Sequence, residues 1–468
     1  MVPVIHAKGE FVKQLLHPGA MVALVVLVVV VLILAGCDAT DFPFDRSNEP
    51  QEEPRQFDED AVSEINAQGD MAIMFANNGR YDYDQMYITI MGIVNGQWSW
   101  VDVTTGEATS ISETPNDMAP PEGKYSPFAG YADIFRKASD IPGQIFPLGN
   151  IESGKMFIAF NSPLYMYFHP TGGFTAPDLN NPDDINAGIR FEVVEFTLND
   201  NDILWINSSR VDAYQYGMGV EVWGFHDNKD WTYETRDGFD YVRIGELLHH
   251  DDILARWRQT VSAPFQYCLR DVVDGEDDGI IEQPSKVPEF KEGGLHSDFF
   301  DAYIDQIWEV FADHDMVIDT GDFGIWRGRV QGGSLSFTAD DHQSYLANTG
   351  SIPWKPTTQD AIEAKGALDT GSKTDRMLQS RFSAGVNRHA IHPDEPARVV
   401  EFSDGDTFFT KHPHNEYTAF LHNPEVSYNS RTYAFAYDDV GDHSSTIVFT
   451  DPRKIRITIG GFWGLNMD

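Results

Sequence analysis

The residues with the clearest chemical potential lie in one stretch, VVEFTLNDNDILWINSSRVD at 193–212. If this stretch begins as a β-strand, its side chains alternate, so Glu195, Thr197 and Asn199 share one face while the apolar residues between them point into the core. A carboxylate, a hydroxyl and an amide are then displayed together, with Trp205 close behind. Polar groups of this kind bind sugar hydroxyls, and an indole ring stacks on a pyranose face. The residues alone thus leave two interpretations, a carbohydrate site or an ordinary polar strand face followed by a loop, and by themselves they favour the second.

Other motifs that could carry chemistry are weak. The chain has no HExxH, no paired CxxC, no GxSxG and no phosphate-binding glycine loop. Residues 249–252 (HHDD) lie on a predicted helix, where adjacent side chains point about 100° apart and cannot share one metal, so a solvated helix face is expected. The acidic loop at 271–282 imitates the first half of a calcium loop, but Ser285 stands where the bidentate Glu belongs. We expect no metal and no cofactor, and calcium at this acidic loop is left open.

Composition narrows the range of partners. The chain of 468 residues has 41% hydrophobic side chains, which is enough to build a large folded core. It carries 33 Lys and Arg against 73 Asp and Glu, a net charge of −40. Binding of polyanions requires clustered cations that release counterions, so DNA, RNA and acidic polysaccharides are poor partners. A neutral ligand is expected.

The N-terminal region predicts export and lipidation. Residues 21–35 form an apolar run of fifteen, shorter than the roughly 20 residues of a bilayer-spanning helix, so the run suits the core of a secretory signal. The run ends in LAGC, which resembles the lipobox of bacterial lipoproteins. We expect a signal peptide at 1–36, a lipid anchor on Cys37 in the bacterial cell envelope (periplasmic or cell-surface), and a flexible acidic tether at 37–68. An uncleaved signal anchor is the alternative.

One further cysteine, Cys268, remains in the expected mature protein. A single thiol cannot form an internal disulfide, so the hydrophobic core must stabilise the fold. The apolar setting of this cysteine (PFQYCL) predicts a buried structural thiol, not a nucleophile.

Short β-type runs separated by Gly, Pro, Asn and Asp clusters dominate from residue 69 onward and return at the end of the chain, where 431–437, for example, reads as a strand. This pattern predicts a β-sandwich or barrel. Segments with apolar residues at helical spacing lie between the two β regions. We therefore expect a mainly β domain interrupted by a mixed α/β domain, with a cleft between them. The expected boundaries are 69–245 and 396–468 for the β domain and 246–395 for the mixed domain.

Five segments resemble glycoside hydrolase family 64, the β-1,3-glucanases built on a thaumatin-like scaffold. The EFTLN segment and the later VD pair resemble the acidic cleft strands of thaumatin-like proteins. The resemblance implies a mainly β fold with an α+β insertion, in which a thaumatin-like β-sandwich or barrel and a mixed α/β domain flank a wide cleft. The segments keep the family's order across about residues 69–461, and they lie at 193–212, 299–308, 323–333, 381–389 and 414–461.

The resemblance also implies site residues and a mechanism. It implies an inverting hydrolase of β-1,3-glucans such as laminarin or curdlan, with Glu195 on the family's general acid and Asp212 on its general base. Partial burial and neighbouring negative charge are expected to keep Glu195 protonated while Asp212 stays charged. Further residues fall on positions that line sugar subsites or border the cleft: Thr197, Asn199, Trp205, Ser209, Asp438 and Asp439.

The separation of the two carboxylates along the chain raises a geometric problem. If residues 199–202 formed a tight turn between straight strands, Asp212 would lie about six residues beyond the partner of Glu195, or roughly 20 Å away at about 3.3 Å per residue. We therefore expect residues 199–209 to loop or bulge before Asp212 joins a strand.

Two other classes of protein compete with the hydrolase. A non-catalytic β-1,3-glucan-binding lipoprotein would use the same cleft, whereas a structural envelope protein would have no affinity for glucan. The hydrolase is favoured because both candidate carboxylates, Glu195 and Asp212, are present. We expect a monomer that binds a neutral β-1,3-glucan and meets the membrane only through its lipid.

Overall fold

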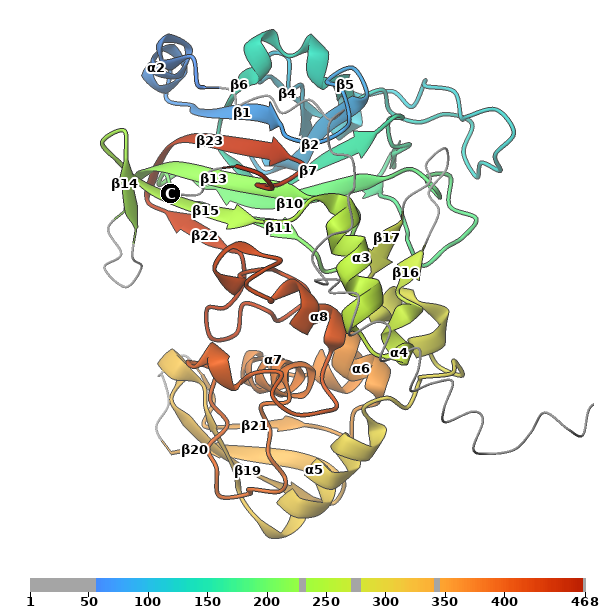
Figure 1. Ribbon diagram of the computed structural model, residues 1–468, viewed down its shortest axis with the longest axis vertical. Coiled ribbons are helices and arrows are strands. Elements are labelled where there is room, and N and C mark those ends of the chain that lie inside the picture. Colours follow the sequence, from blue (N-terminus) through green and yellow to red (C-terminus); the bar gives the residue numbers. More distant parts are fainter. Residues whose placement is uncertain (1–55, 227–232, 271–278, 341–345, 466–468) are drawn as a thin grey trace, which may run out of the picture. The chain divides into compact units, whose positions relative to one another are not determined.

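The computed structural model describes residues 56–226, 233–270, 279–340 and 346–465, which belong to one compact unit. These residues form a mainly β fold with two large sheets, three smaller sheets and several helices (Figure 1). Cys37 and the apolar run before it lie outside the described residues, as do residues 271–278 of the acidic loop. Among the described residues, no helix has the length and apolar character needed to cross a membrane.

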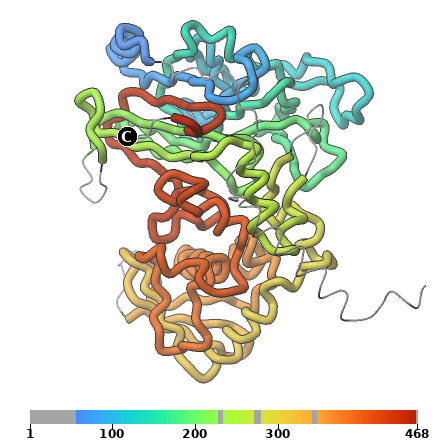
Figure 2. Tube along the Cα trace, viewed as in Figure 1, coloured from blue at the N-terminus to red at the C-terminus, as the bar shows by residue number. Residues whose placement is uncertain are grey.

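The first large sheet brings together the two ends of the folded chain. Its strand order is β14-β15-β13-β23-β1-β6. The first strand, β1, pairs in parallel with the last strand, β23, which pairs on its other side with β13; Figure 2 shows this red segment beside the blue one. The strands are β1 (Met71–Asn77), β6 (Ile145–Leu148), β13 (Met218–Phe225), β14 (Glu234–Arg236), β15 (Phe239–Gly245) and β23 (Asp451–Ile459).

The second large sheet is antiparallel and contains the strand of Glu195. Its order is β22-β11-β10-β7-β2-β3-β4, and β5 also pairs with β2. The strands are β2 (Met86–Val94), β3 (Gln97–Val101), β4 (Ala108–Ser110), β5 (Arg136–Lys137), β7 (Ile151–Phe160), β10 (Phe191–Leu198), β11 (Leu204–Ser209) and β22 (Ile447–Phe449).

The two large sheets share one hydrophobic core, to which Ile73 and Ile457 of the first sheet and Ile158 and Val194 of the second contribute. Because side chains alternate along a strand, the opposite face of the second sheet carries a separate set of residues. Part of that face is covered by a smaller apolar cluster, which includes Phe157 of β7. We call this second face the outer face, and Glu195 lies on it.

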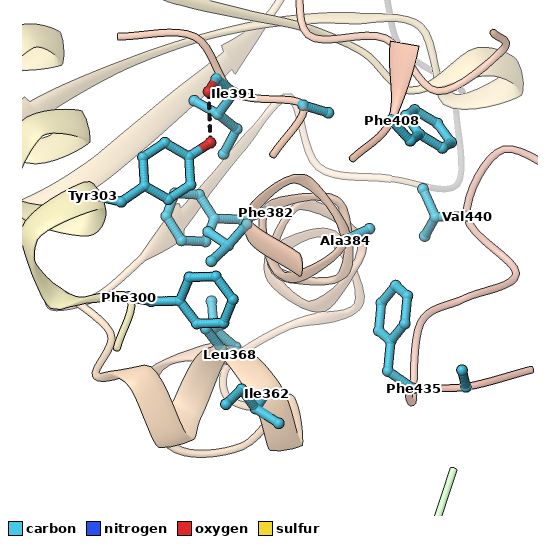
Figure 3. Close-up of a cluster of buried hydrophobic side chains, with 14 of the residues drawn as sticks. Phe300, Tyr303, Ile362, Leu368, Phe382, Ala384, Ile391, Phe408, Phe435 and Val440 are labelled. Atoms are coloured by element: carbon cyan, nitrogen blue, oxygen red, sulfur yellow. Dashed lines mark hydrogen bonds between the residues drawn. The ribbon is translucent and has the colours of Figure 1, made fainter. Parts of the chain in front are cut away.

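Most of the remaining helices and two of the small sheets surround another hydrophobic core, which includes Phe300 and, on α7, Phe382 (Figure 3). The helices are α3 (His250–Thr260), α4 (Ala263–Gln266), α5 (Asp301–Asp313), α6 (Thr358–Glu363), α7 (Lys373–Arg388) and α8 (Glu416–Leu421). The strands are β8 (Tyr167–Phe168), β9 (Phe174–Thr175), β12 (Ala213–Tyr214), β16 (Leu269–Arg270), β17 (Ile280–Glu282), β18 (Met316–Asp319), β19 (Ile325–Gln331), β20 (Ser334–Ala339) and β21 (Thr349–Ile352). The third small sheet, formed by β8 and β9, packs instead against the smaller apolar cluster on the outer face.

Two local expectations are wrong. Residues 431–437 do not form a strand, and only Tyr433 makes an isolated bridge, to Ser209. The described part of the expected tether at 37–68 contains helix α2 (Glu59–Ala67), which buries Val62. The short apolar side of α2 was too small to stand out from the surrounding acidic residues. The expected domain boundaries, and the cleft between the domains, stay predictions.

Candidate active site

Glu195 lies on the outer face of the second large sheet, as the alternation of strand β10 predicts. Val194 and Phe196, its neighbours along the strand, are buried in the core between the large sheets. The antiparallel register places Asn207 of β11 opposite Glu195 on one side and Lys155 of β7 on the other. Directly opposite residues share a face of a sheet. The carboxyl group of Glu195 is therefore flanked by an amide and an ammonium group.

The turn between β10 and β11 uses one of the predicted sugar-binding residues. The Asn199 side-chain oxygen accepts hydrogen bonds from the backbone N–H groups of Asn201 (2.9 Å) and Ile203 (3.1 Å). This is the arrangement in which an Asn side chain closes a turn. The oxygen of Asn199 thus stabilises the hairpin, and Asn199 does not line the pocket described below.

The expectation that residues 199–209 loop or bulge is wrong. After the short turn, β11 runs as a regular strand from Leu204 to Ser209, paired with β10 on one side and β22 on the other. The chain changes direction only after Ser209, where Arg210 donates its backbone N–H to the carbonyl oxygen of Tyr433 (2.8 Å). This hydrogen bond to Tyr433, which is distant in sequence, thus holds the chain where it turns towards Asp212.

A buried ion cluster fixes this change of direction. The Arg210 guanidinium is completely buried and pairs with the carboxylates of Glu192 and Glu246. The backbone oxygen of Arg210 accepts a hydrogen bond from the Tyr417 hydroxyl (2.7 Å). Burial raises the pKa of the Glu192 carboxyl to about 7, against the opposing effects of Arg210 and two backbone N–H groups. These contacts leave the segment before Asp212 little freedom to move.

Glu195, Ser209 and Asp212 line one open pocket of about 200 Å³. Phe157, Phe191 and other apolar residues form part of its wall. The structure therefore brings together three of the predicted site residues, although Glu195 and Asp212 lie on different structural segments. A pocket with carboxylates, a hydroxyl and apolar rings suits a ligand with both hydroxyl groups and apolar ring faces.

Each candidate catalytic carboxylate in the pocket pairs with a lysine that sequence reasoning missed. Lys155 Nζ lies 2.7 Å from Glu195 Oε1, and Lys286 Nζ lies 2.8 Å from Asp212 Oδ1. The sequence predicted a negative charge next to Glu195. The structure instead places the Lys155 ammonium in contact with it. Strand register decides the first pair, and the sequence carries no local signal for it.

Thr197 and Trp205 continue the outer face beyond the pocket. They lie opposite each other in the β10–β11 register, two positions along from Glu195 and Asn207. The Thr197 hydroxyl accepts a hydrogen bond from the backbone N–H of Ser153 (3.1 Å). The Trp205 side chain is 39% exposed, so its indole remains accessible to a ligand.

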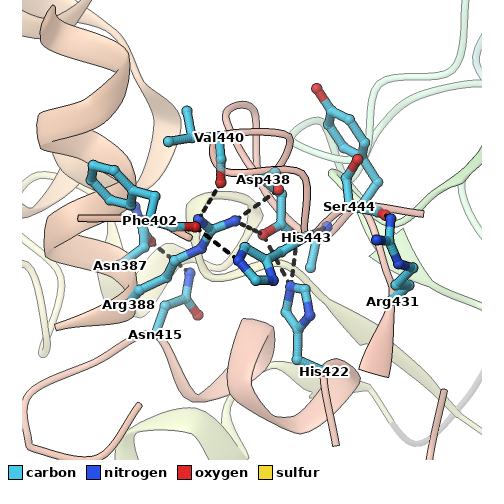
Figure 4. Close-up of polar contacts among 12 residues, drawn as sticks. Asn387, Arg388, Phe402, Asn415, His422, Arg431, Asp438, Val440, His443 and Ser444 are labelled. Atoms are coloured by element: carbon cyan, nitrogen blue, oxygen red, sulfur yellow. Dashed lines mark hydrogen bonds and ion pairs between the residues drawn. The ribbon is translucent and has the colours of Figure 1, made fainter. Parts of the chain in front are cut away.

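The prediction that Asp438 borders the cleft is wrong. Its side chain is completely buried and accepts hydrogen bonds from Arg388 (2.9 Å), His422 Nε2 (3.0 Å) and the backbone N–H of Ala434 (2.8 Å) (Figure 4). Burial opposes its charge, yet His422 and Arg388 hold the pKa of Asp438 below its usual range. The next residue, Asp439, is exposed but does not line the pocket. The sequence alone could not tell which of these two neighbouring aspartates is buried and which is exposed.

Among the residues that the structure describes, the other candidate motifs give no second site. His249 caps helix α3 with its side chain, whereas His250 is buried against Tyr214, so the expected solvated face is wrong for His250. Across the residues that the structure describes, no group of three or more His, Cys, Asp or Glu side chains could hold a metal ion. Cys268 is buried and unpaired, which confirms the predicted structural thiol.

Comparison with known proteins relates this fold to one enzyme family. The family model of glycoside hydrolase family 64, described as β-1,3-glucanase, matches residues 69–459. A glucan endo-1,3-beta-glucosidase of Cellulosimicrobium cellulans is 25% identical over 323 residues, which cover 67% of this chain and 53% of that protein. The chain thus spans about half the length of the curated relatives it matches.

Solved structures share the fold. A β-1,3-glucanase domain from Clostridium beijerinckii superposes with a TM-score of 0.70 at 28% identity, over 84% of this chain and 98% of that one. A laminaripentaose-producing β-1,3-glucanase in complex with laminaritetraose superposes with a TM-score of 0.64 at 22% identity, over 84% of this chain and 99% of that one. At this lower identity the likeness concerns the fold alone.

Proposed function

Because the chain belongs to glycoside hydrolase family 64, we propose that it is an endo-acting β-1,3-glucanase that hydrolyses laminarin- or curdlan-like polymers to short oligosaccharides. The observation that carries this proposal is the pocket that Glu195 and Asp212 line together. The net charge of −40 favours a neutral polymer over an acidic one. The similar β-1,3-glucanase domain from Clostridium beijerinckii and the similar glucan endo-1,3-beta-glucosidase of Cellulosimicrobium cellulans support a β-1,3-linked glucan as the ligand class.

The proposed mechanism inverts the anomeric configuration. Glu195 donates a proton to the leaving glycosidic oxygen, while Asp212 accepts a proton from the water that attacks the anomeric carbon from the opposite face. This chemistry requires the two carboxyl groups to stand about 6.5–9.5 Å apart, so that the water fits between them. Lys286 Nζ lies 2.8 Å from Asp212 Oδ1, which places a cation next to the proposed base. Trp205 extends the site along the polymer by stacking on one glucosyl unit.

The stereochemistry of the first product tests the mechanism. We expect NMR of a laminarin digest to detect the α-anomer of the new reducing end before mutarotation. Early appearance of the β-anomer would overturn the assignment of Glu195 and Asp212 as acid and base, because a retaining enzyme needs a nucleophile in place of a base.

Variants of the two carboxylates separate an enzyme from a simple binding protein. Glu195→Gln and Asp212→Asn should each reduce kcat by about 10²–10⁴-fold, the usual contribution of a general acid or base, and should retain glucan binding. Glu152→Gln is a suitable control, because Glu152 is an exposed carboxylate on β7 outside the pocket lining. A non-catalytic binder would release no sugar in any form, and its affinity for laminarin would change little on Glu195→Gln.

The proposed setting is the bacterial cell envelope, where a lipid on Cys37 would hold a monomeric enzyme at a membrane. The apolar run and the LAGC sequence support this part of the proposal. Expression in a bacterium with labelled fatty acid should label the protein, and Cys37→Ser should abolish the label. Retention of the label in Cys37→Ser would exclude this anchor.

A further inference from the structure

We propose that the protein has a second glucan-binding site, in a pocket that the proposed catalytic groups do not reach. This pocket has a volume of about 660 Å³, which exceeds the volume of the pocket lined by Glu195 and Asp212. Within the described part of the chain, the linings of the two pockets share no residue. The proposal rests on the proposed function, because it assigns a β-1,3-glucan to both pockets. The second site holds the polymer and does not cleave it.

Segments that are distant in sequence build the second pocket, which we call the α5–α7 pocket. Helix α5 contributes Ala302, Tyr303 and Gln306 to its lining. His389, which directly follows α7, contributes an imidazole, and residues 411–413 close the pocket before α8 begins. Tertiary packing therefore creates the pocket, and no local motif in the sequence indicates it.

Two ring side chains of the α5–α7 pocket are fixed by backbone groups. His389 Nδ1 donates to the carbonyl oxygen of Pro413 (2.7 Å), and the Tyr303 hydroxyl donates to the carbonyl oxygen of Ile391 (2.5 Å; Figure 3). The rings of Tyr303 and His389 stack with their centroids 4.2 Å apart. Side chains that are already fixed lose little conformational entropy when a ligand binds. This wall of the pocket is therefore preorganised.

His389 has one ring nitrogen left for a ligand. Because Nδ1 carries the proton that is donated to Pro413, Nε2 of the neutral ring is an acceptor. Burial lowers the pKa of His389 below its usual value, so the ring is neutral at pH 7. Nε2 makes no hydrogen bond with any residue that the structure describes. A sugar hydroxyl that enters the pocket can donate to it.

The charges of the α5–α7 pocket favour a neutral ligand. Lys411 Nζ lies 2.8 Å from Asp394 Oδ2 and 3.3 Å from Glu395 Oε1, so its charge is already matched. Glu416, a second carboxylate of the lining, accepts a hydrogen bond from the backbone N–H of Ser262 (2.6 Å). An anion would meet these carboxylates, and a cation would meet the ammonium group. Hydroxyl groups both donate and accept, so they can pair with groups of either kind.

Aromatic rings give the pocket apolar surfaces for a sugar ring. Phe299 of the lining packs edge to face against Phe265 and Phe300, with ring centroids 5.2 Å and 5.0 Å away. The exposed ring of His412 stacks on that of His414 at 4.4 Å. A pyranose has apolar C–H faces as well as hydroxyl groups. A pocket that combines fixed rings with a few polar groups therefore suits a carbohydrate.

A second site strengthens the attachment of the enzyme to a polymer. Once one site holds a glucan particle, binding at the other site becomes intramolecular, and its effective concentration is high. Helix α8 connects the two pockets. Glu416 of the α5–α7 pocket begins this helix, and the next residue, Tyr417, bonds to the backbone oxygen of Arg210, close to Asp212. The same packed elements thus fix both sites in one protein.

Filling the α5–α7 pocket tests the proposal, with Asp212→Asn as an inactive parent protein. Ala302 is exposed on α5 and lines the pocket, so an indole in Ala302→Trp occupies the pocket without disturbing the core. Titration calorimetry with laminarihexaose should find two sites per chain in the parent and one in Ala302→Trp. Ala312→Trp is the matched control, because Ala312 is exposed on α5 outside the lining. This control should keep both sites.

Insoluble curdlan provides a second measurement, since its particles present many chains to both sites. We expect Ala302→Trp to bind curdlan at least about ten-fold more weakly than the parent, because the avidity of two sites is lost. Gln306→Ala combined with His412→Ala should act in the same direction. Both residues are exposed, so this pair of changes serves if Ala302→Trp does not fold.

The outcomes separate the second site from the glucanase. One laminarihexaose site in the parent, or two in a folded Ala302→Trp, would overturn the second site and leave the proposed function intact. Binding of cellohexaose, a β-1,4-linked glucan, in place of laminarihexaose would overturn the ligand assigned to the pocket. If the wild type released no sugar while Ala302→Trp still removed one of two sites, the proposed function would fail and the second site would stand.

Discussion

Arg210 and Asp212 are separated by one residue, yet the Arg210 side chain is completely buried while 65% of the Asp212 side chain is exposed. Glu192 and Glu246 hold the buried guanidinium, and the chain reaches the pocket wall directly afterwards. The position of Asp212 therefore depends on a buried ion cluster whose central residue, Arg210, does not line the pocket.

Replacing Arg210 should destabilise the protein strongly. Arg210→Met leaves Glu192 and Glu246 buried without their cation, and breaking such a cluster costs about 3–5 kcal/mol of the free energy of unfolding. Urea denaturation followed by tryptophan fluorescence measures the change. Arg376→Met is the matched control, because Arg376 forms an exposed pair with Asp369 and should cost about 0–1 kcal/mol. Similar losses in both variants would contradict a special role for the cluster.

Trp205 should contribute to polymer binding more than to chemistry. Removing an aromatic contact of this kind costs at least about 1 kcal/mol of binding free energy, so Trp205→Ala should raise KM for laminarin by about five-fold or more, with a smaller change in kcat. Trp354→Ala serves as the comparison, since Trp354 is 52% exposed and follows β21 of a different sheet, whereas Trp205 lies in the same sheet as Glu195. An unchanged KM in Trp205→Ala would remove Trp205 from the binding surface.

Asn199 should behave as a turn residue. Asn199→Ala loses two hydrogen bonds that close the β10–β11 turn, each worth about 0.5–1.5 kcal/mol, and should lower the free energy of unfolding. Asn199→Asp retains an acceptor oxygen and should stay closer to the wild type in stability. A large loss of glucan affinity in Asn199→Asp, with stability retained, would instead restore the predicted sugar contact through the amide nitrogen.

The Asp438 cluster should make stability depend on acid pH. The pKa of Asp438 in the folded state lies below the usual 3.8, so the charged group stabilises the fold above that value and this contribution is lost as the pH falls through the lowered pKa. At pH 7, Asp438→Asn should therefore cost about 3–5 kcal/mol, because Arg388 and His422 lose a buried partner. The difference from the wild type should shrink towards pH 3 in urea titrations. A constant difference across this range would contradict the assignment.

Local patterns in the sequence predicted those features that depend on near neighbours. The alternation of polar and apolar residues placed Glu195 and Thr197 on the outward face of β10, because a strand with one buried face has only one way to point its side chains. The apolar residues next to Cys268 in the sequence likewise predicted its burial. The helical spacing of apolar residues between the two β regions predicted helices there, and α7 is one of them.

Contacts between distant segments decided the rest. Strand register placed Lys155 beside Glu195, the carbonyl of Tyr433 redirected the chain before Asp212, and Arg388 with His422 enclosed Asp438. None of these partners is close in sequence to the group it affects. By itself, the sequence determined which side chains could do chemistry and which strand face carried them. Only the tertiary structure decided which acids meet in a pocket and which are buried, because the energy of a charged group depends on neighbours that folding brings to it.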